Sequence, residues 1–245
     1  MRSLVSTSSA HSSRDTAAGT AEFGVVPVEN STEGVISRSL DLFLQSPLHV
    51  VGETSLLVRH NLLRTTPSLD GIEVVLAHPQ ALAQCQGWLS SHHPTLERVP
   101  VSSNAEGARL ASIEPHTAAI AADIAAARYG LAFVAHGIQD DPGNRTRFVV
   151  IGRYECAPSG HDQTTMVLSV PDRAGAVHAL IEPLARHGVS MKRFESRPAR
   201  QGSWEYYFYI DIQGHPSQPN VASALKELQS LCAFYKVLGT YPVGN

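Results

Sequence analysis

A polar linker at residues 155–163, ECAPSGHDQ, separates two stretches of the chain whose hydrophobic patterns differ. Before the linker, short apolar runs such as Phe23–Val28 alternate with segments of helical periodicity, as at Ile36 and Leu40. Strands that alternate with helices predict an α/β layer with parallel strand pairing. We therefore expect two domains, with their boundary near residue 158.

The segment after the linker contains four expected strands and two expected helices in the order β-α-β-β-α-β, which is the ferredoxin-like pattern. Its clearest strand has apolar and other residues in strict alternation, at Trp204, Tyr206, Phe208, Ile210 and Ile212. A period of two predicts a strand that lies with one face on a core. The fold class is therefore α/β, with a small second domain at the C-terminal end.

Composition and charge exclude several classes of protein. The chain has 245 residues, with 19 Lys and Arg against 22 Asp and Glu, and its pI is about 6.4. A nucleic-acid-binding surface needs a basic stripe, which this balance argues against. No apolar run approaches the roughly 20 residues of a membrane-spanning helix. The 3 cysteines, an odd number without a CxxC pair, argue against a disulfide framework and common zinc sites. We therefore expect a cytoplasmic protein without a metal.

A polar loop, Glu29-Asn30-Ser31-Thr32-Glu33-Gly34, follows the apolar run directly. Polar groups between a buried strand and a helix lie where open α/β sheets bind ligands, and backbone N–H groups at the helix start could hold a carboxylate. Capping of a helix that begins at Gly34, with Ser31 as the N-cap, explains the same residues. Both interpretations stay open, and the residues alone favour capping.

A second cluster, Asn144-Arg145-Thr146-Arg147-Phe148, places two guanidinium groups beside a hydroxyl where a loop meets a strand. Arginine binds carboxylates and a hydroxyl donates hydrogen bonds, so the cluster would suit a dianionic substrate. The alternative is a solvated turn before an edge strand. Alternation puts Thr146 and Phe148 on one face and Arg147 on the other, so Thr146 and Arg147 should not point into one cleft.

A third cluster joins two segments of the C-terminal domain, Arg173-Ala174-Gly175-Ala176-Val177 and Glu195-Ser196-Arg197-Pro198. A glycine at a helix N-terminus allows close approach, and the N–H groups there can bind the carboxylate of an amino acid. A tight turn and an ordinary strand connection explain the same residues without a ligand.

Four motifs occur in the order in which they occur in one enzyme family. They are GVVPVENSTEG (Gly24–Gly34), AHPQALAQCQGWL (Ala77–Leu89), GNRTRF (Gly143–Phe148) and ESRP (Glu195–Pro198). On these motifs the chain, from about residue 17 to its end, resembles prephenate dehydratase followed by an ACT regulatory domain. The resemblance implies a two-lobed, periplasmic-binding-protein-like catalytic domain over residues 17–157 and the ACT domain over 158–245. The Ser-rich residues 1–16 are expected to be disordered or non-native.

The resemblance also implies a difference from the family. Catalytic domains of this family normally begin with a strand and a Gly-rich GPxGTFS-type segment before the ENSTEG region. No such segment is present in the printed sequence, so we expect at least one βα unit, on the order of 30 residues, to be missing.

The activity that the resemblance implies is conversion of prephenate to phenylpyruvate with loss of CO2 and water, in phenylalanine biosynthesis. It assigns the key hydroxyl to Thr146, as an oriented hydrogen-bond donor or as the formal acid. No cofactor is expected, because aromatisation of the ring supplies the driving force. The residues expected to bind the substrate are Glu29, Asn30, Ser31, Gln84, Ser103, Arg145, Arg147 and Phe148.

The ACT resemblance implies that phenylalanine binds as an inhibitor. Its expected contacts are Gly175, Ala176, Val177, Glu195, Ser196, Arg197 and Pro198. We expect a homodimer or homotetramer, with no nucleic-acid or membrane partner. Two alternatives remain, a non-catalytic amino-acid sensor and an inactive truncated dehydratase, and the sequence does not separate prephenate from arogenate as substrate.

Overall fold

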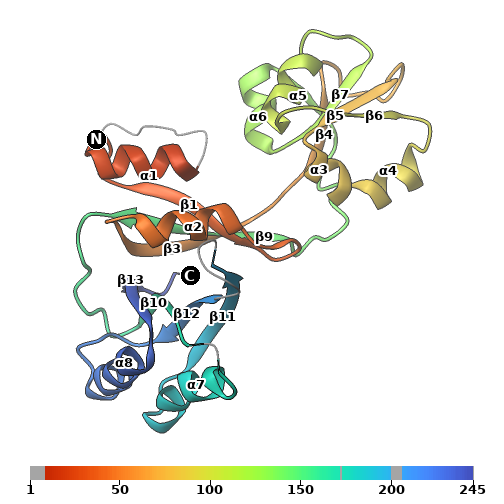
Figure 1. Cartoon of the computed structure of the whole chain (residues 1–245). Helices are drawn as coiled ribbons and strands as arrows, with labels where there is room; N and C mark the ends of the chain where they lie inside the picture. The colour runs from red at the N-terminus through yellow and green to blue at the C-terminus, as the bar shows by residue number, and fades with distance from the viewer. Residues whose placement is uncertain (1–8, 172, 200–205, 245) are drawn as a thin grey trace. The chain divides into compact units, whose positions relative to one another are not determined.

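Figure 1 shows the computed structural model of the chain, which describes residues 9–171, 173–199 and 206–244. The chain forms two compact units. One unit runs to Leu56 and resumes at Thr146, and the other comprises Leu57–Arg145. In the described part of the chain, no helix has both the length and the apolar character needed to cross a membrane.

The unit of residues 57–145 is a five-stranded sheet in the order β6-β5-β7-β4-β8, with four short helices. Its strands are β4 (Asn61–Arg64), β5 (Val74–Ala77), β6 (Glu97–Pro100), β7 (Thr117–Ala121) and β8 (Ala132–Ala135). Its helices are α3 (Pro79–Gln84), α4 (Gln86–His92), α5 (Asn104–Ala111) and α6 (Asp123–Tyr129).

Strand pairing in this sheet follows the sequence prediction only in part. β5 pairs in parallel with β6 and β7, as helical crossovers require. β4 instead runs antiparallel to both of its neighbours, β7 and β8. No helix lies between β3 and β4 in the chain, so β4 is not the end of a helical crossover that would make it parallel to a neighbouring strand.

The other unit contains two four-stranded sheets. The first has the order β2-β1-β9-β3 and carries two helices. Its elements are α1 (Ser9–Ala18), β1 (Gly24–Asn30), β2 (Gly34–Val35), α2 (Ser37–Gln45), β3 (His49–Leu57) and β9 (Arg145–Gly152). The second sheet has the order β11-β12-β10-β13, and its β-α-β-β-α-β sequence of elements confirms the predicted ferredoxin-like pattern. Its elements are β10 (Asp162–Ser169), α7 (Ala176–Arg186), β11 (Met191–Pro198), β12 (Tyr206–Gln213), α8 (Pro219–Leu231) and β13 (Phe234–Pro242).

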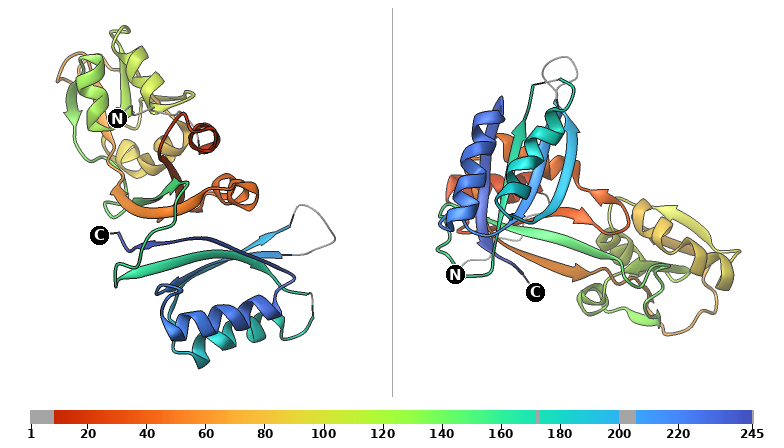
Figure 2. Two further views of the ribbon diagram at one scale, coloured as in Figure 1. Left: turned by 90° about the vertical axis from the view of Figure 1, so that its left-hand side faces the viewer. Right: turned by 90° about the horizontal axis from the view of Figure 1, so that it is seen from below.

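The second sheet is covered on both faces. Figure 2 shows α7 and α8 on one side of it and the first sheet on the other. Phe208 and Ile210 pack in the core under the two helices, whereas Tyr209 belongs to a core shared with Val26 and Val149 of the first sheet. The predicted strand with one face on a core is thus confirmed, and its other face is buried as well. Trp204 lies outside the described residues.

The N-terminal prediction also needs correction where the structure describes it. Residues 9–16, expected to be disordered, belong to α1, while residues 1–8 lie outside the described part. Gly24 of β1 lies so close to α1 that a Cβ there would meet the Thr16 hydroxyl at 2.8 Å, and Arg153 donates to the carbonyls of Thr16 and Ala17. Small and polar side chains make these contacts, so no apolar periodicity indicated them.

Candidate active site

A partly buried hydrogen bond joins two of the predicted site residues. Asn30 ends β1 and lies directly opposite Thr146 of β9 in the antiparallel ladder. The Asn30 side chain donates from Nδ2 to Thr146 Oγ1 over 3.0 Å, across 116 positions of sequence. Asn30 is only 5% exposed, so packing as well as this bond holds the amide. The structure thus brings the ENSTEG and GNRTRF motifs together at one pair of side chains.

The loop after Asn30 fixes which way its amide points. Asn30 Oδ1 accepts the backbone N–H groups of Thr32 and Glu33 at 3.0 and 3.1 Å. An oxygen that accepts two N–H groups must be the carbonyl oxygen, so the NH2 group faces Thr146. Gly34, at a φ of +80°, then returns the chain as the short strand β2, which suits a residue without a Cβ.

The predicted helix start at Gly34 is wrong. Helix α2 begins at Ser37, and the residue before it, Ile36, makes no side-chain cap. Ser31 is an exposed turn residue and not an N-cap. The backbone N–H groups that were expected to bind a carboxylate belong instead to the Asn30 turn, whose local polar contacts compete with helix formation.

The Asn30–Thr146 geometry defines what the hydroxyl can do. Thr146 Oγ1 accepts a hydrogen bond from the amide, which leaves its own O–H to donate to a further acceptor. An amide NH2 group cannot take up a proton, so this contact orients the threonine hydroxyl without making it a nucleophile. The arrangement is suited to donating a hydrogen bond to an oxygen that gains negative charge.

Arg147 points away from Thr146, as the strand alternation predicts. Its guanidinium forms ion pairs with Glu53 at 2.7 Å and with Asp211 of β12 at 2.8 Å, and it donates to the Tyr241 hydroxyl. Burial alone would lower the pKa of Arg147, but the charges of Asp211, Tyr241 and Glu53 outweigh it, so the pKa is raised. Arg147 is therefore a fixed cation bonded to the second sheet, which argues against direct contact with substrate.

Glu29 shares this face with Arg147. The two are opposite each other on β1 and β9, and their charged groups are 3.9 Å apart. Glu29 also pairs with Arg193 of β11 at 3.1 Å. Of the predicted substrate-binding residues, Glu29 and Arg147 thus face the ACT sheet, and Asn30 adjoins Thr146.

The remaining predicted residues on the same strand have simpler surroundings. Arg145 begins β9 and is exposed, one position before Thr146. Phe148 lies two positions after Thr146, half-buried and opposite Pro27. By alternation Phe148 shares the strand face of Thr146.

Gln84 has a partner that the sequence analysis missed. In the unit of residues 57–145, Gln84 Oε1 lies 2.8 Å from Nε2 of His60, a residue that is 6% exposed. Burial lowers the pKa of His60, and the hydrogen bond to Gln84 opposes this only partly. If the neutral ring carries its proton on Nε2, it donates to Gln84 Oε1 and fixes the carbonyl end of that amide. A single histidine directly before a strand carries no sequence signal that separates this role from ordinary burial.

Ser103 has a structural role in the same unit. Its hydroxyl accepts the backbone N–H of Glu106 at 3.1 Å and so caps α5. The serine is the N-cap that the helix requires, whatever else it contacts.

The predicted effector segments lie at α7 and β11. Gly175 is the N-cap of α7 with a φ of +79°, a conformation that favours glycine, and Val177 in the first turn is 42% exposed. Along β11 the side chains alternate. Phe194 packs on Phe208 under the helices, whereas Arg197 points to the first sheet and pairs with Asp41 of α2 at 3.6 Å. The ESRP motif therefore presents residues to two sides of the sheet.

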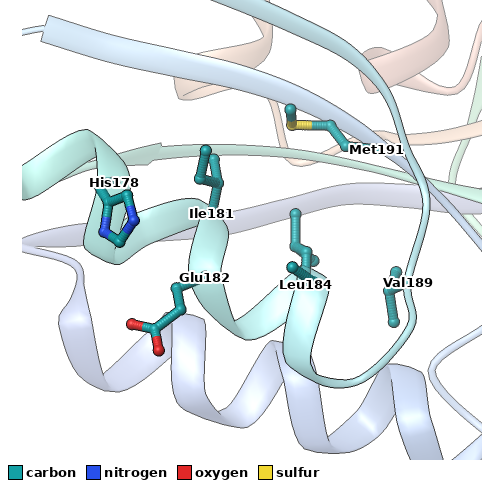
Figure 3. A pocket seen from close by; sticks show the side chains of 7 residues that line it. His178, Ile181, Glu182, Leu184, Val189 and Met191 are labelled. Atoms are coloured by element: carbon teal, nitrogen blue, oxygen red, sulfur yellow. The ribbon is translucent and has the colours of Figure 1, made fainter.

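An apolar hollow of about 350 Å³ lies between α7 and the start of β11. In Figure 3, His178, Ile181 and Glu182 project from α7, and Met191 lies across from them. Leu184, Ala185 and Val189 complete its lining. The lining includes none of the predicted effector residues at 175–177 and 195–198.

The three cysteines are poorly suited to act as nucleophiles. Burial raises the pKa of all three thiols, to about 12 for Cys85 and about 11 for Cys232, so they are poor nucleophiles. Within residues 9–171, 173–199 and 206–244, no group of three or more His, Cys, Asp and Glu residues is arranged to hold a metal ion.

Comparison with known proteins identifies both parts of the chain. A family model for prephenate dehydratase matches residues 2–156, and one for the ACT domain matches residues 164–229. The chain is 48% identical to the bifunctional chorismate mutase/prephenate dehydratase of Neisseria gonorrhoeae over 225 residues, which cover 91% of this chain and 62% of that protein. The chain spans about three fifths of the length of the first curated relatives that it matches.

Two solved structures cover 98% of the chain with a TM-score of 0.87 each. One is the prephenate dehydratase of Arthrobacter aurescens in complex with L-Phe, which is 33% identical and is covered over 81% of its length. The other is GqqA, described as a novel type of quorum quenching acylase, 29% identical and covered over 89%. Because the catalytic-domain match spans more than half of the sequence and includes both residues of the Asn30–Thr146 pair, the chain belongs to the prephenate dehydratase family.

Proposed function

We propose that this chain is a cytoplasmic enzyme that converts prephenate to phenylpyruvate with release of CO2 and water. The observation that carries the proposal is the Asn30–Thr146 hydrogen bond, which presents an oriented hydroxyl within the matched catalytic region. Family membership makes this reaction class the first to consider, and the geometry suits its chemistry.

The main chemical requirement of the reaction is stabilisation of the hydroxyl leaving group. The bond between the ring and its carboxylate breaks, its electron pair enters the ring, and the ring C–O bond on the opposite side breaks. The oxygen leaves with its electron pair and takes up one proton to become water. Because the product ring is aromatic, the overall step is downhill, and a hydrogen bond to the leaving oxygen lowers the barrier.

Each residue of the site has a proposed part in this step. Thr146 donates a hydrogen bond from its hydroxyl to the leaving oxygen, and Asn30 positions Thr146. Arg145 pairs with a carboxylate of the substrate, since its guanidinium is on an exposed residue one position before Thr146. Gln84, which contacts His60 in the unit of residues 57–145, is proposed as a further substrate-binding residue of that unit.

The test compares four chains for phenylpyruvate formation from prephenate and, in parallel, for turnover of arogenate. Thr146→Val removes the hydroxyl with little change of shape, and Thr146→Ser keeps it. Asn30→Asp replaces the donor by a carboxylate, which would accept the Thr146 hydrogen and withdraw it from the substrate. Calorimetric binding of prephenate and thermal unfolding are measured for every variant.

We expect Thr146→Val and Asn30→Asp each to lose about 10²–10⁴-fold in kcat, as removal of a proton-donating group does, with prephenate still bound. Thr146→Ser should retain most of the activity. Full turnover by a folded Thr146→Val chain would overturn the assignment, as would a folded wild-type chain that makes no phenylpyruvate.

We further propose that phenylalanine binds the ACT domain and inhibits the reaction. The ACT match and the L-Phe complex of the Arthrobacter aurescens relative support this. The proposed contacts are those predicted from the sequence, at residues 175–177 and 195–198. Calorimetry with L-phenylalanine, with D-phenylalanine as the control, tests binding, and loss of L-phenylalanine binding in Gly175→Val tests the site.

We infer a homo-oligomer built from pairs of ACT domains. β11 lies at one end of its sheet, so its outer backbone groups can pair with the same strand of a second copy. Val177 and Met191 nearby are 42% and 38% exposed, more than apolar side chains of a monomer's core. Light scattering should give at least twice the monomer mass, and Met191→Asp should reduce it.

Amide hydrolysis is the second candidate, since the fold neighbour GqqA is described as an acylase. That reaction needs a nucleophile whose proton a base removes. Here the Thr146 partner is itself a donor, and the three thiols have raised pKa values. The same preparations incubated with an N-acylated amine decide between the two, because release of free amine that depends on Thr146 would favour the acylase.

A further inference from the structure

Two charged residues flank the Asn30–Thr146 pair in the sequence. Glu29 precedes Asn30, and Arg147 follows Thr146. The register of β1 and β9 puts Glu29 opposite Arg147, just as it puts Asn30 opposite Thr146. The catalytic pair and the charged pair are therefore neighbouring rungs of one ladder, on opposite faces of the sheet.

The ACT sheet presents a second charged pair to the first. Arg193 of β11 and Asp211 of β12 are also directly opposite each other in their own ladder. Arg193 Nε lies 3.1 Å from Glu29 Oε2, and Asp211 Oδ2 lies 2.8 Å from the guanidinium of Arg147. Each sheet thus supplies one acid and one arginine, and each arginine pairs with the acid of the other sheet. We refer to these four residues, Glu29, Arg147, Arg193 and Asp211, as the interlock.

The side chains of the interlock are partly shielded from water. Side-chain exposure is 2% for Asp211, 13% for Arg193, 21% for Arg147 and 36% for Glu29. Ion pairs in such surroundings are screened less than surface pairs, so they lose more interaction energy when the distance between the charges changes. Asp211 is in addition held by the Thr165 hydroxyl over 2.7 Å, so it is anchored in the ACT sheet.

The strand that supplies Arg193 also carries the proposed effector residues. Arg193 lies two positions before Glu195, and Arg197 of the same strand pairs with Asp41 of α2. A ligand that binds at residues 195–198 therefore acts on a strand that contacts β1 and α2 through one ion pair each. A shift of β11 changes the Arg193–Glu29 contact one residue away from Asn30.

We propose that the interlock couples β11 to the Asn30–Thr146 pair and is the route by which an amino acid bound at β11 controls turnover. Glu29, Arg147, Arg193 and Asp211 are positioning residues, since none of them needs to touch the substrate. The inference rests on the proposed function for its readout of activity, and the tests below separate the two.

The decisive variant is Arg193→Gln, which removes the charge facing Glu29 and keeps a side chain of similar length. Arg193→Lys restores the charge. The matched control is Arg186→Gln, which removes an arginine of the same domain whose ion pairs, with Glu182 and Glu227, lie on the helix side. Asp211→Asn tests the second half of the interlock if Arg193→Gln fails to fold.

Three quantities are measured on each full chain. They are L-phenylalanine affinity by calorimetry, inhibition of phenylpyruvate formation by L-phenylalanine, and hydrogen exchange of the β1 and β9 backbone with and without L-phenylalanine. Allosteric coupling is commonly about 5–150-fold, and we expect Arg193→Gln to reduce it to about 2-fold or less while binding L-phenylalanine within about 3-fold of wild type. Basal activity should stay within about 3-fold, Arg193→Lys should recover most of the coupling, and Arg186→Gln should match wild type.

The outcomes distinguish this inference from the proposed function. Ligand-dependent exchange in β1 and β9 that is lost in Arg193→Gln supports the interlock even if no phenylpyruvate forms. An Arg193→Gln chain that is inhibited as strongly as wild type overturns the interlock and leaves the enzyme assignment intact. Wild-type chain that binds no L-phenylalanine, or binds it without any change in β1 and β9, also overturns it.

Discussion

Replacing Arg147 with methionine removes the guanidinium from the interlock and leaves a long apolar side chain in its place. Asp211, which is 2% exposed, then keeps the Thr165 hydroxyl as a donor but loses its cation. Removing one partner of a buried ion pair costs about 3–5 kcal/mol, because the other charge stays buried without compensation. The Arg147 side chain is 21% exposed, so water reaches part of the pair, and we expect a loss near the lower end, about 3 kcal/mol.

This loss is large enough to measure by two methods. In a chain of this size each kcal/mol of destabilisation lowers Tm by about 2–4 °C, so Arg147→Met should melt about 6–12 °C below wild type. Urea unfolding gives the free energy directly. Arg147→Met, Asp211→Asn and the double variant form a double-mutant cycle, and we expect a coupling energy of at least about 1.5 kcal/mol, because the double variant no longer buries the lone Asp211 charge.

A matched exposed pair serves as the control. Arg109 and Glu106 form an ion pair whose side chains are 50% and 35% exposed, so Arg109→Met should leave the stability close to wild type. A loss below about 1 kcal/mol in Arg147→Met is what a surface pair would show. That result, or strictly additive effects of Arg147→Met and Asp211→Asn, would refute the reasoning.

Three further predictions concern stability. Because burial lowers the pKa of His60 from 6.5, the unfolded chain binds a proton more readily, so urea unfolding should show stability falling as pH drops below 6.5, with a smaller slope in His60→Gln. Lys236 donates to three backbone carbonyls at the end of α2, so Lys236→Met should lose about 1.5–3 kcal/mol, whereas the exposed Lys226→Met should change little. The added Cβ of Gly239→Ala would overlap the backbone of β3, so this variant should lose about 3 kcal/mol or more of stability. The control is Gly52→Ala, whose added Cβ meets nothing nearer than 3.8 Å. Equal Tm values for the two variants would contradict this packing.

The elements of the ACT domain could be predicted because each depends on a local pattern. Alternation marks strands, and the i, i+3, i+4 spacing marks helices, without reference to the rest of the chain. The same argument separated the chain into an α/β part and a β-α-β-β-α-β part, and the family and fold class expected from the motifs are confirmed.

The local patterns did not predict which other parts of the chain pack against an element. β12 is buried on both faces, because a second sheet packs against the side that alternation left polar, and Asp211 and Tyr209 lie there. The loop after Asn30 was expected to start a helix, but the Asn30 side chain binds the N–H groups of Thr32 and Glu33 and turns the chain back. Polar side chains that bind the local backbone defeat propensity arguments of this kind.

What the sequence by itself determined is the identity of the motifs and the face on which each residue of a strand lies. Period-two alternation separates Thr146 from Arg147 in any regular strand, since it is a property of the backbone. Only the tertiary structure decided what each face meets. Asn30 reaches Thr146 from 116 positions away, and Asp211 reaches Arg147 from 64 positions away. Strand register and the packing of one sheet on another set those partners, and both arise from contacts over the whole unit that no local pattern encodes.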